Sequence, residues 1–154
     1  MDLYCKIQMP DNTTSSVDLE RLMEDDQRFQ GVLTRPILNK LRVGTYVINI
    51  DDDLFDQTKG THWIGLIVLS TKSVLYFDAF GMYPITDIIT LYPEVIYSDY
   101  QIQDLKSTAC GFYSVAFLKN VKSIATFRKF VQRFNQDTFN NDNVLRKKYK
   151  LEVK

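Results

Sequence analysis

Apolar residues recur at helical spacing near the start of the chain. A helix is expected over residues 17–29, where they fall at i, i+3 and i+4, with Ser15 or Ser16 as its N-cap. A short second helix is expected over residues 34–41, since proline is tolerated in a first helical turn.

The middle of the chain changes to short runs rich in β-branched and aromatic residues. Strands are expected over residues 45–50, 62–69, 74–78 and 95–100. The second and third of these are joined across residues 70–73 as a hairpin. In a hairpin, the start of the first strand and the end of the second lie at the same edge of the ladder. The residues near 62 and near 78 should therefore lie close together.

Helical periodicity returns in the last third of the chain. Residues 111–121 are apolar around most of the helix circumference, which predicts a buried central helix. Residues 124–134 predict an amphipathic helix over the core, and residues 143–149 a basic one. The expected fold is α+β, with a small, mostly antiparallel sheet against a central helix and further helices at both ends. No linker or repeat is visible, so residues 1–154 are expected to form a single domain.

Charge is distributed unevenly along this neutral chain. Residues 1–118 carry 9 Lys/Arg against 16 Asp/Glu, a net of −7, whereas residues 119–154 carry 10 against 3, a net of +7. The basic C-terminal region is either a surface for DNA or another acidic partner, or simply a solvated helix surface.

Cysteine and histidine usage limits the available chemistry. The two cysteines, Cys5 and Cys110, show neither zinc-type spacing nor a disulfide ladder, which favours a reducing, intracellular setting. The N-terminus lacks a signal-peptide pattern, and the longest apolar run, residues 63–69, is too short to span a membrane. With one histidine, the chain offers too few ligands for metal catalysis, and no metal or cofactor is expected.

Cys110 is expected in the first turn of the central helix, with Ser107 or Thr108 as the helix cap. A helix N-terminus and a nearby imidazolium both stabilise a thiolate, the reactive form of cysteine. His62 is the only histidine in the chain. It is therefore the only candidate for the base that such a nucleophile requires.

Two further residues complete a candidate acyl-transfer site. The predicted hairpin brings Asp78 near His62, where its carboxylate would orient the imidazole ring. Gln103 lies seven residues before Cys110 and would aim its amide at the developing oxyanion, with the Cys110 backbone N–H as second donor.

Each of these residues has an ordinary structural alternative. A lone cysteine is more often a small buried hydrophobic residue, a lone histidine a satisfied core residue, and an aspartate after a strand a turn residue. The catalytic hypothesis therefore depends on the order and spacing of all four.

That order resembles the adenovirus protease (adenain) type of cysteine protease. The matching motifs are Gly60-Thr-His62-Trp63, Phe77-Asp78-Ala-Phe-Gly81 and Gln103-x6-Cys110-Gly111. The type belongs to the clan of the ubiquitin-like-protein proteases and is found in virophages and polinton-type elements. Two departures are an Asp where the adenoviral acid is Glu, and a step of sixteen residues from the histidine to the acid.

The resemblance implies an adenain-like fold and a thiol endopeptidase that cleaves capsid and core precursor proteins during virion maturation, after small or Gly residues. It implies a location at the assembly site inside the host and in the virion. Trp63 would contact the substrate beside the histidine, with core packing as the alternative. Activation by DNA, through the basic region 119–154, or by a peptide is left open.

Three other functions remain open at this point. The first is a closely related enzyme, a deconjugase of a ubiquitin-like modifier, although 154 residues leave little surface for docking a folded modifier. A His-acid-Cys site also serves acetyltransferase effectors. A binding protein that keeps only the fold is the non-enzymatic alternative.

Overall fold

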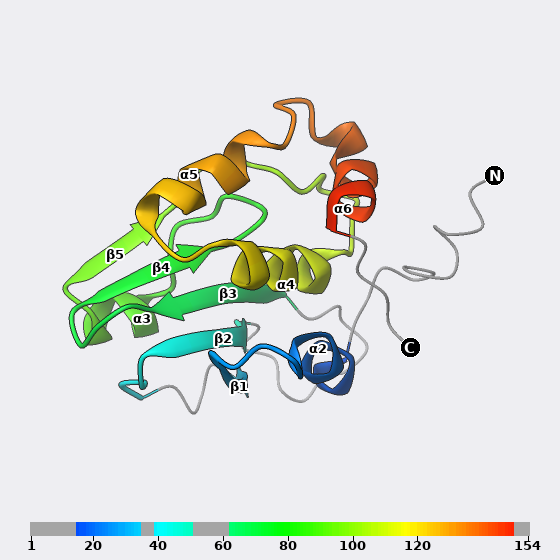
Figure 1. Ribbon diagram of the computed structural model, residues 1–154. Coiled ribbons are helices and arrows are strands. Elements are labelled where there is room, and N and C mark those ends of the chain that lie inside the picture. Colours follow the sequence, from blue (N-terminus) through cyan, green and yellow to red (C-terminus); the bar gives the residue numbers. More distant parts are fainter. Residues whose placement is uncertain (1–14, 35–38, 51–61, 150–154) are drawn as a thin grey trace.

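The computed structural model describes residues 15–34, 39–50 and 62–149. Its centre is one five-stranded sheet in which the strands follow one another in chain order (Figure 1). The strands are β1 (Phe29–Thr34), β2 (Gly44–Asn49), β3 (Trp63–Val68), β4 (Ser73–Phe77) and β5 (Glu94–Tyr97). The fold is α+β, as the sequence predicts.

The sheet is mixed, whereas the sequence predicts a mostly antiparallel one. The β2–β3 and β3–β4 pairs are antiparallel, but the outer pairs β1–β2 and β4–β5 are parallel. A parallel pair needs a crossover, which α3 (Thr86–Leu91) provides between β4 and β5. The sequence pattern does not predict α3, because it has six residues and is rich in β-branched side chains that disfavour helix.

The N-terminal helix is shorter than expected. Helix α2 (Ser16–Met23) begins at the N-cap Ser15, which forms a reciprocal capping box with Asp18. It ends six residues before the predicted end, and the chain turns into β1 instead. Of the helix predicted over residues 34–41, Thr34 belongs to β1 and residues 39–41 are not helical, so that prediction is wrong there; residues 35–38 lie outside the described ranges.

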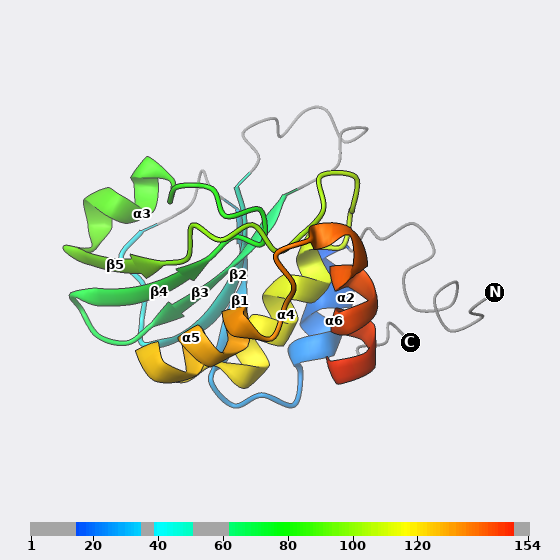
Figure 2. The same ribbon diagram turned by 90° about the horizontal axis from the view of Figure 1, so that it is seen from above.

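The remaining helices match their predicted positions closely. They are α4 (Cys110–Asn120), α5 (Ile124–Gln132) and α6 (Asn141–Tyr149), the last preceded by the 3-10 turn η2 (Thr138–Asn140). Helices α2, α4, α5 and α6 lie on one side of the sheet and α3 lies on the other (Figure 2). No helix in the described ranges is both long and apolar enough to cross a lipid bilayer.

Helix α4 lies directly on the sheet. Every residue from Cys110 to Leu118 is buried, so this helix is apolar and enclosed around its whole circumference over these residues. Gly65 in β3 permits this close packing, because a Cβ atom there would approach the Phe117 ring to 2.6 Å. The sheet and the start of α4 are thereby brought within hydrogen-bond range of each other.

Candidate active site

The β3–β4 hairpin brings His62 and Asp78 together. His62 precedes β3 and Asp78 follows β4, and the antiparallel register places these two ends side by side. His62 Nε2 lies 2.9 Å from Asp78 Oδ1, which confirms that the two residues meet as the sequence predicts. The carboxylate is almost completely buried, whereas the His62 side chain keeps 22 % of its surface exposed.

Cys110 is the first residue of α4, and its thiol faces the start of β3. The Trp63 backbone N–H donates to Cys110 Sγ over 3.4 Å, and Cys110 is one of the two groups that raise the pKa of His62. The Ser114 hydroxyl lies one helical turn further on, within 2.9 Å of the Cys110 carbonyl and 3.2 Å of the Trp63 carbonyl. The nucleophile candidate is therefore fixed to the strand that carries the histidine.

The electrostatic surroundings of His62 favour its charged form. Burial alone lowers the pKa of the imidazole, but hydrogen bonds with Asp78 and Cys110, and the charges of these two groups, raise that pKa to about 9. The raised pKa favours the imidazolium form of the ring at neutral pH. The imidazolium can neutralise a thiolate on one side while Asp78 holds its Nε2 on the other.

Phe80 completes the support of the histidine ring. Its ring is stacked on His62 with a centroid separation of 5.0 Å, and its backbone N–H donates to Asp78 Oδ1 over 2.8 Å. The turn continues through Gly81, whose φ of +74° is one that glycine adopts readily. A Cβ atom at this position would also come within 2.8 Å of the Asp99 carbonyl oxygen. Phe80 belongs to the sequence motif, but only the fold shows that it holds the imidazole.

Gln103 is fully buried in the loop that leads to Cys110. Its backbone N–H donates to the Ala79 carbonyl over 2.8 Å, which attaches this loop to the residue after Asp78. Its side-chain Nε2 donates to the Ser107 carbonyl over 3.0 Å and lies 3.3 Å from the Ser107 hydroxyl. Gln103 Oε1 has no hydrogen-bond partner among the described residues. The amide thus helps to hold the loop, and the oxyanion role of Gln103 stays a prediction.

The predicted helix cap at Ser107 or Thr108 is wrong. The N-cap of α4 is Ala109, and no side chain caps it. The Ser107 hydroxyl instead accepts from the Ala109 N–H over 3.2 Å and donates to Asp142 at the start of α6. Because no side-chain oxygen covers the N-terminus of α4, the positive end of its dipole acts on the Cys110 region.

Trp63 contributes to the site mainly through its backbone. Its ring belongs to the core cluster under α4 and is only 5 % exposed, so it offers little surface to a substrate. Core packing, the alternative named for this residue, accounts for its position.

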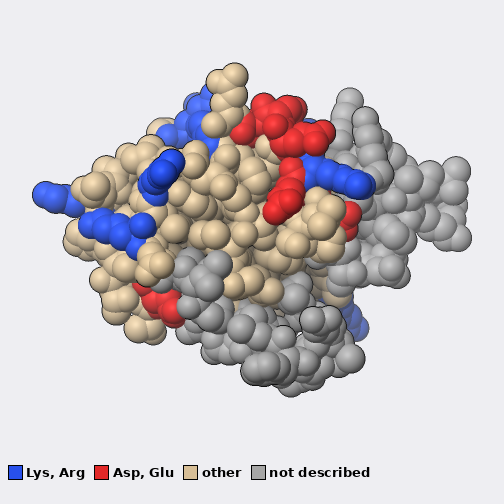
Figure 3. Space-filling model, turned by 90° about the horizontal axis from the view of Figure 1, so that it is seen from below, with Lys and Arg blue, Asp and Glu red and all other residues tan. Residues whose placement is uncertain are grey.

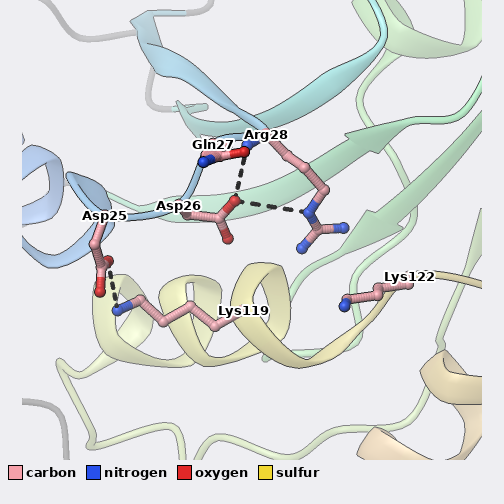
Figure 4. A pocket seen from close by; sticks show the side chains of 6 residues that line it. All are labelled: Asp25, Asp26, Gln27, Arg28, Lys119 and Lys122. Atoms are coloured by element: carbon pink, nitrogen blue, oxygen red, sulfur yellow. Dashed lines mark hydrogen bonds and ion pairs between the residues drawn. The ribbon is translucent and has the colours of Figure 1, made fainter.

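A separate hollow lies at the opposite end of α4. It has a volume of about 330 Å³, and mainly charged side chains line it (Figure 4): Asp25, Asp26, Gln27, Arg28, Lys119 and Lys122. The Arg28 guanidinium donates to the Leu118 carbonyl over 2.6 Å and to the Val121 carbonyl over 3.3 Å. Arg28 thus donates hydrogen bonds to two carbonyls at the C-terminal end of α4. The residues around this hollow therefore hold the end of the helix that lies far from Cys110.

Figure 3 shows one face of the molecule from below, on which most of the basic side chains lie toward one end and a group of acidic side chains lies toward the other, with a basic side chain next to it. Among residues 15–34, 39–50 and 62–149, no group of three His, Cys, Asp or Glu side chains is arranged to hold a metal ion. Cys5 lies outside the described ranges.

Comparison with known proteins shows the fold of this chain. No protein-family model matches it, and no curated protein matches it significantly. The ASFV pS273R protease is similar in structure, with a TM-score of 0.54 and 14 % identity over 94 % of this chain and 67 % of that one. Its selenomethionine structure gives a TM-score of 0.53 at 14 % identity, with 86 % of this chain and 65 % of that one covered. This chain therefore has the fold of a viral protease and spans about two thirds of that protease's length.

Proposed function

We propose that this chain is a cysteine endopeptidase with Cys110 as nucleophile, His62 as acid and base, and Asp78 as the residue that orients the imidazole. The observation that carries the proposal is the alignment of these three side chains. Asp78 Oδ1 lies 2.9 Å from His62 Nε2, and the thiol of Cys110, at the start of a buried helix, interacts with His62 so as to raise the pKa of the imidazole. The fold shared with the ASFV pS273R protease supports it.

The reaction begins from the ion pair of the Cys110 thiolate and the His62 imidazolium. The sulfur attacks the peptide carbonyl carbon, and the oxyanion is held by the Cys110 N–H and the Gln103 amide. His62 then gives its proton to the leaving amine as the C–N bond breaks. A water molecule loses a proton to His62 and attacks the thioester, which releases the carboxylic acid and restores the thiolate.

The substrates that we propose are viral structural precursors, cut after small or Gly residues. The reaction needs no cofactor or metal, and the protease acts at the assembly site and in the virion. Support for this finer assignment comes from the motif resemblance and from the viral protease that shares the fold. DNA, bound through the basic region 119–154, or a peptide is the proposed activator.

Cleavage-site profiling on a library of denatured peptides tests the enzyme class directly. Wild-type protein should produce cuts that the Cys110→Ala protein does not, and small or Gly residues should be enriched before the scissile bond. A second arm with added DNA tests for an activator. The absence of cuts specific to the wild type in both arms, together with alkylation of Cys110 no faster than that of free cysteine, would contradict the proposal.

A further inference from the structure

The loop before Cys110 is attached to the C-terminal segment at three points. Thr138 Oγ1 donates to Asp104 Oδ1 over 3.0 Å, and the buried Asn141 donates from Nδ2 to the Ile102 carbonyl over 2.8 Å. The third contact is between Ser107 and Asp142, the second residue of α6. These residues are more than thirty positions apart in the chain, so tertiary packing alone brings them together.

The Asp142 carboxylate of the third contact accepts hydrogen bonds from two different segments. Its Oδ2 accepts from the Ser107 hydroxyl over 2.8 Å, and its Oδ1 accepts from the Tyr113 hydroxyl over 2.7 Å. Tyr113 belongs to α4 and is fully buried, so its burial, and then the negative charge of Asp142, raise its pKa and keep the phenol protonated as a donor. One carboxylate therefore joins the loop to the helix that carries Cys110.

The direction of the Ser107 hydrogen bonds depends on that carboxylate. A hydroxyl has one proton to donate, and here the proton goes to Asp142. The Ser107 oxygen is then left to accept from the Ala109 N–H and from Gln103 Nε2. The same Gln103 nitrogen also donates to the Ser107 carbonyl. The orientation of the Gln103 amide thus follows from Ser107, and that of Ser107 from Asp142.

We infer that Asp142 is a positioning residue that acts through Ser107 to hold the loop of residues 103–109 and the first turn of α4, and with them the two oxyanion donors of the proposed site. The inference rests on the proposed function, because it assigns a role in that same site. Asp142 touches neither Cys110 nor His62 in the described contacts, so its influence should reach the transition state but not the reactivity of the thiolate.

The Asp142→Asn variant separates charge from shape. The carboxylate accepts two O–H donors, whereas an amide of the same size has one acceptor oxygen and an NH2 group, so only one of the two hydroxyls can still donate to its own oxygen of residue 142 and the other bond is reversed or lost. The variant should lower kcat about tenfold and leave KM within about twofold, since the lost geometry serves only the transition state. Ser107→Ala should have a similar effect. The exposed Lys147 on the same helix provides the control, and Lys147→Ala should leave kcat unchanged.

A double-mutant cycle distinguishes positioning from general destabilisation. If Asp142 acts through Gln103, the Gln103→Ala/Asp142→Asn protein should have the same kcat as Gln103→Ala alone. Alkylation of Cys110 by iodoacetamide should stay within about twofold of wild type in Asp142→Asn. Additive losses in kcat, or slow alkylation of Cys110, would overturn the inference.

Hydrogen exchange separates this inference from the proposed function. The backbone amides of residues 103–109 should exchange faster in Asp142→Asn than in wild type, with the Ala109 amide most affected, and should be unchanged in Lys147→Ala. Unchanged exchange in Asp142→Asn overturns the positioning role even where wild type cleaves peptides. Faster exchange supports that role even where wild type cleaves none, in which case the proposed function fails separately.

Discussion

The two sides of the candidate site are built in different ways. On the histidine side, one hairpin supplies His62, Asp78 and Phe80 from within nineteen consecutive residues, and strand register brings them together. On the opposite side, Gln103 and Ser107 lie in a loop whose position depends on Asp142, thirty-five residues from Ser107. The first side is attached by backbone pairing in the sheet. The second is attached by backbone hydrogen bonds only at its start, where residues 102 and 103 donate to Ala79, and by side-chain hydrogen bonds from there to Ala109. The second should therefore be the more sensitive to single substitutions at a distance.

The largest effect is expected where the two sides meet. Cys110→Ala and His62→Ala should each abolish peptide cleavage, because one removes the nucleophile and the other its only base. Turnover of a peptide found by profiling measures this, and circular dichroism checks that each variant is folded. Near-normal turnover in either variant would remove the assignment of both residues.

A substitution confined to the loop side should be the next most severe. Gln103→Ala should lower kcat on the order of a hundredfold with little change in KM, as expected for loss of one oxyanion donor. Steady-state kinetics measure the two constants separately. A rise in KM at constant kcat would instead assign Gln103 to substrate binding.

The hairpin side can be tested through the ionisation of His62. Its pKa is raised from 6.5 to about 9, so its stabilising contacts are fully present below pH 6.5 and are lost as pH rises through 9. The free energy of unfolding of wild type should fall over this interval, by on the order of 2 kcal/mol. Asp78→Asn should make that fall smaller, because it removes the carboxylate that holds the charged ring, and should lower kcat less than Cys110→Ala does. Chemical denaturation at pH 6.5 and at pH 9 measures the free energy of unfolding of each protein. An equal fall between the two pH values in wild type and in Asp78→Asn would count against the pairing of His62 with Asp78.

The smallest effect is expected from the ring that supports the histidine. Phe80→Leu keeps the apolar character and the backbone N–H that donates to Asp78, but it removes the stacking on His62. It should reduce kcat/KM only a few fold, since an aromatic pair contributes about 1 kcal/mol beyond its buried area. A loss as large as that of Gln103→Ala would show that the hairpin alone does not position the imidazole.

The same contrast explains what could be predicted from the sequence. Strand periodicity predicts β3 and β4 closely, and a hairpin leaves little freedom in where His62 and Asp78 lie, so their contact is confirmed. The interactions of Ser107 depend on the position of Asp142, and no local pattern links two residues so far apart. A helix cap was therefore expected at Ser107, whereas its hydroxyl bonds with α6.

The missed strand β1 has a similar cause. The strand has only six residues, and Gln30 and Gly31 interrupt its apolar positions, so no strand period stands out in its sequence. Its parallel pairing with β2 decides the matter, and that pairing is a long-range property. The catalytic roles of the four site residues and the single-domain organisation stay predictions.

Helix α4 is secured at both ends, by Ser114 against β3 near Cys110 and by the Arg28 guanidinium at its last carbonyls. Gly65 lies beneath this helix, and the two pack so closely that a Cβ atom at Gly65 would clash with the Phe117 ring. A helix held in this way cannot slide along its axis or lift without disturbing the core. Under the proposed function, a substitution or ligand that alters this site should therefore act by moving the loop before Cys110 rather than by moving the helix that carries the sulfur.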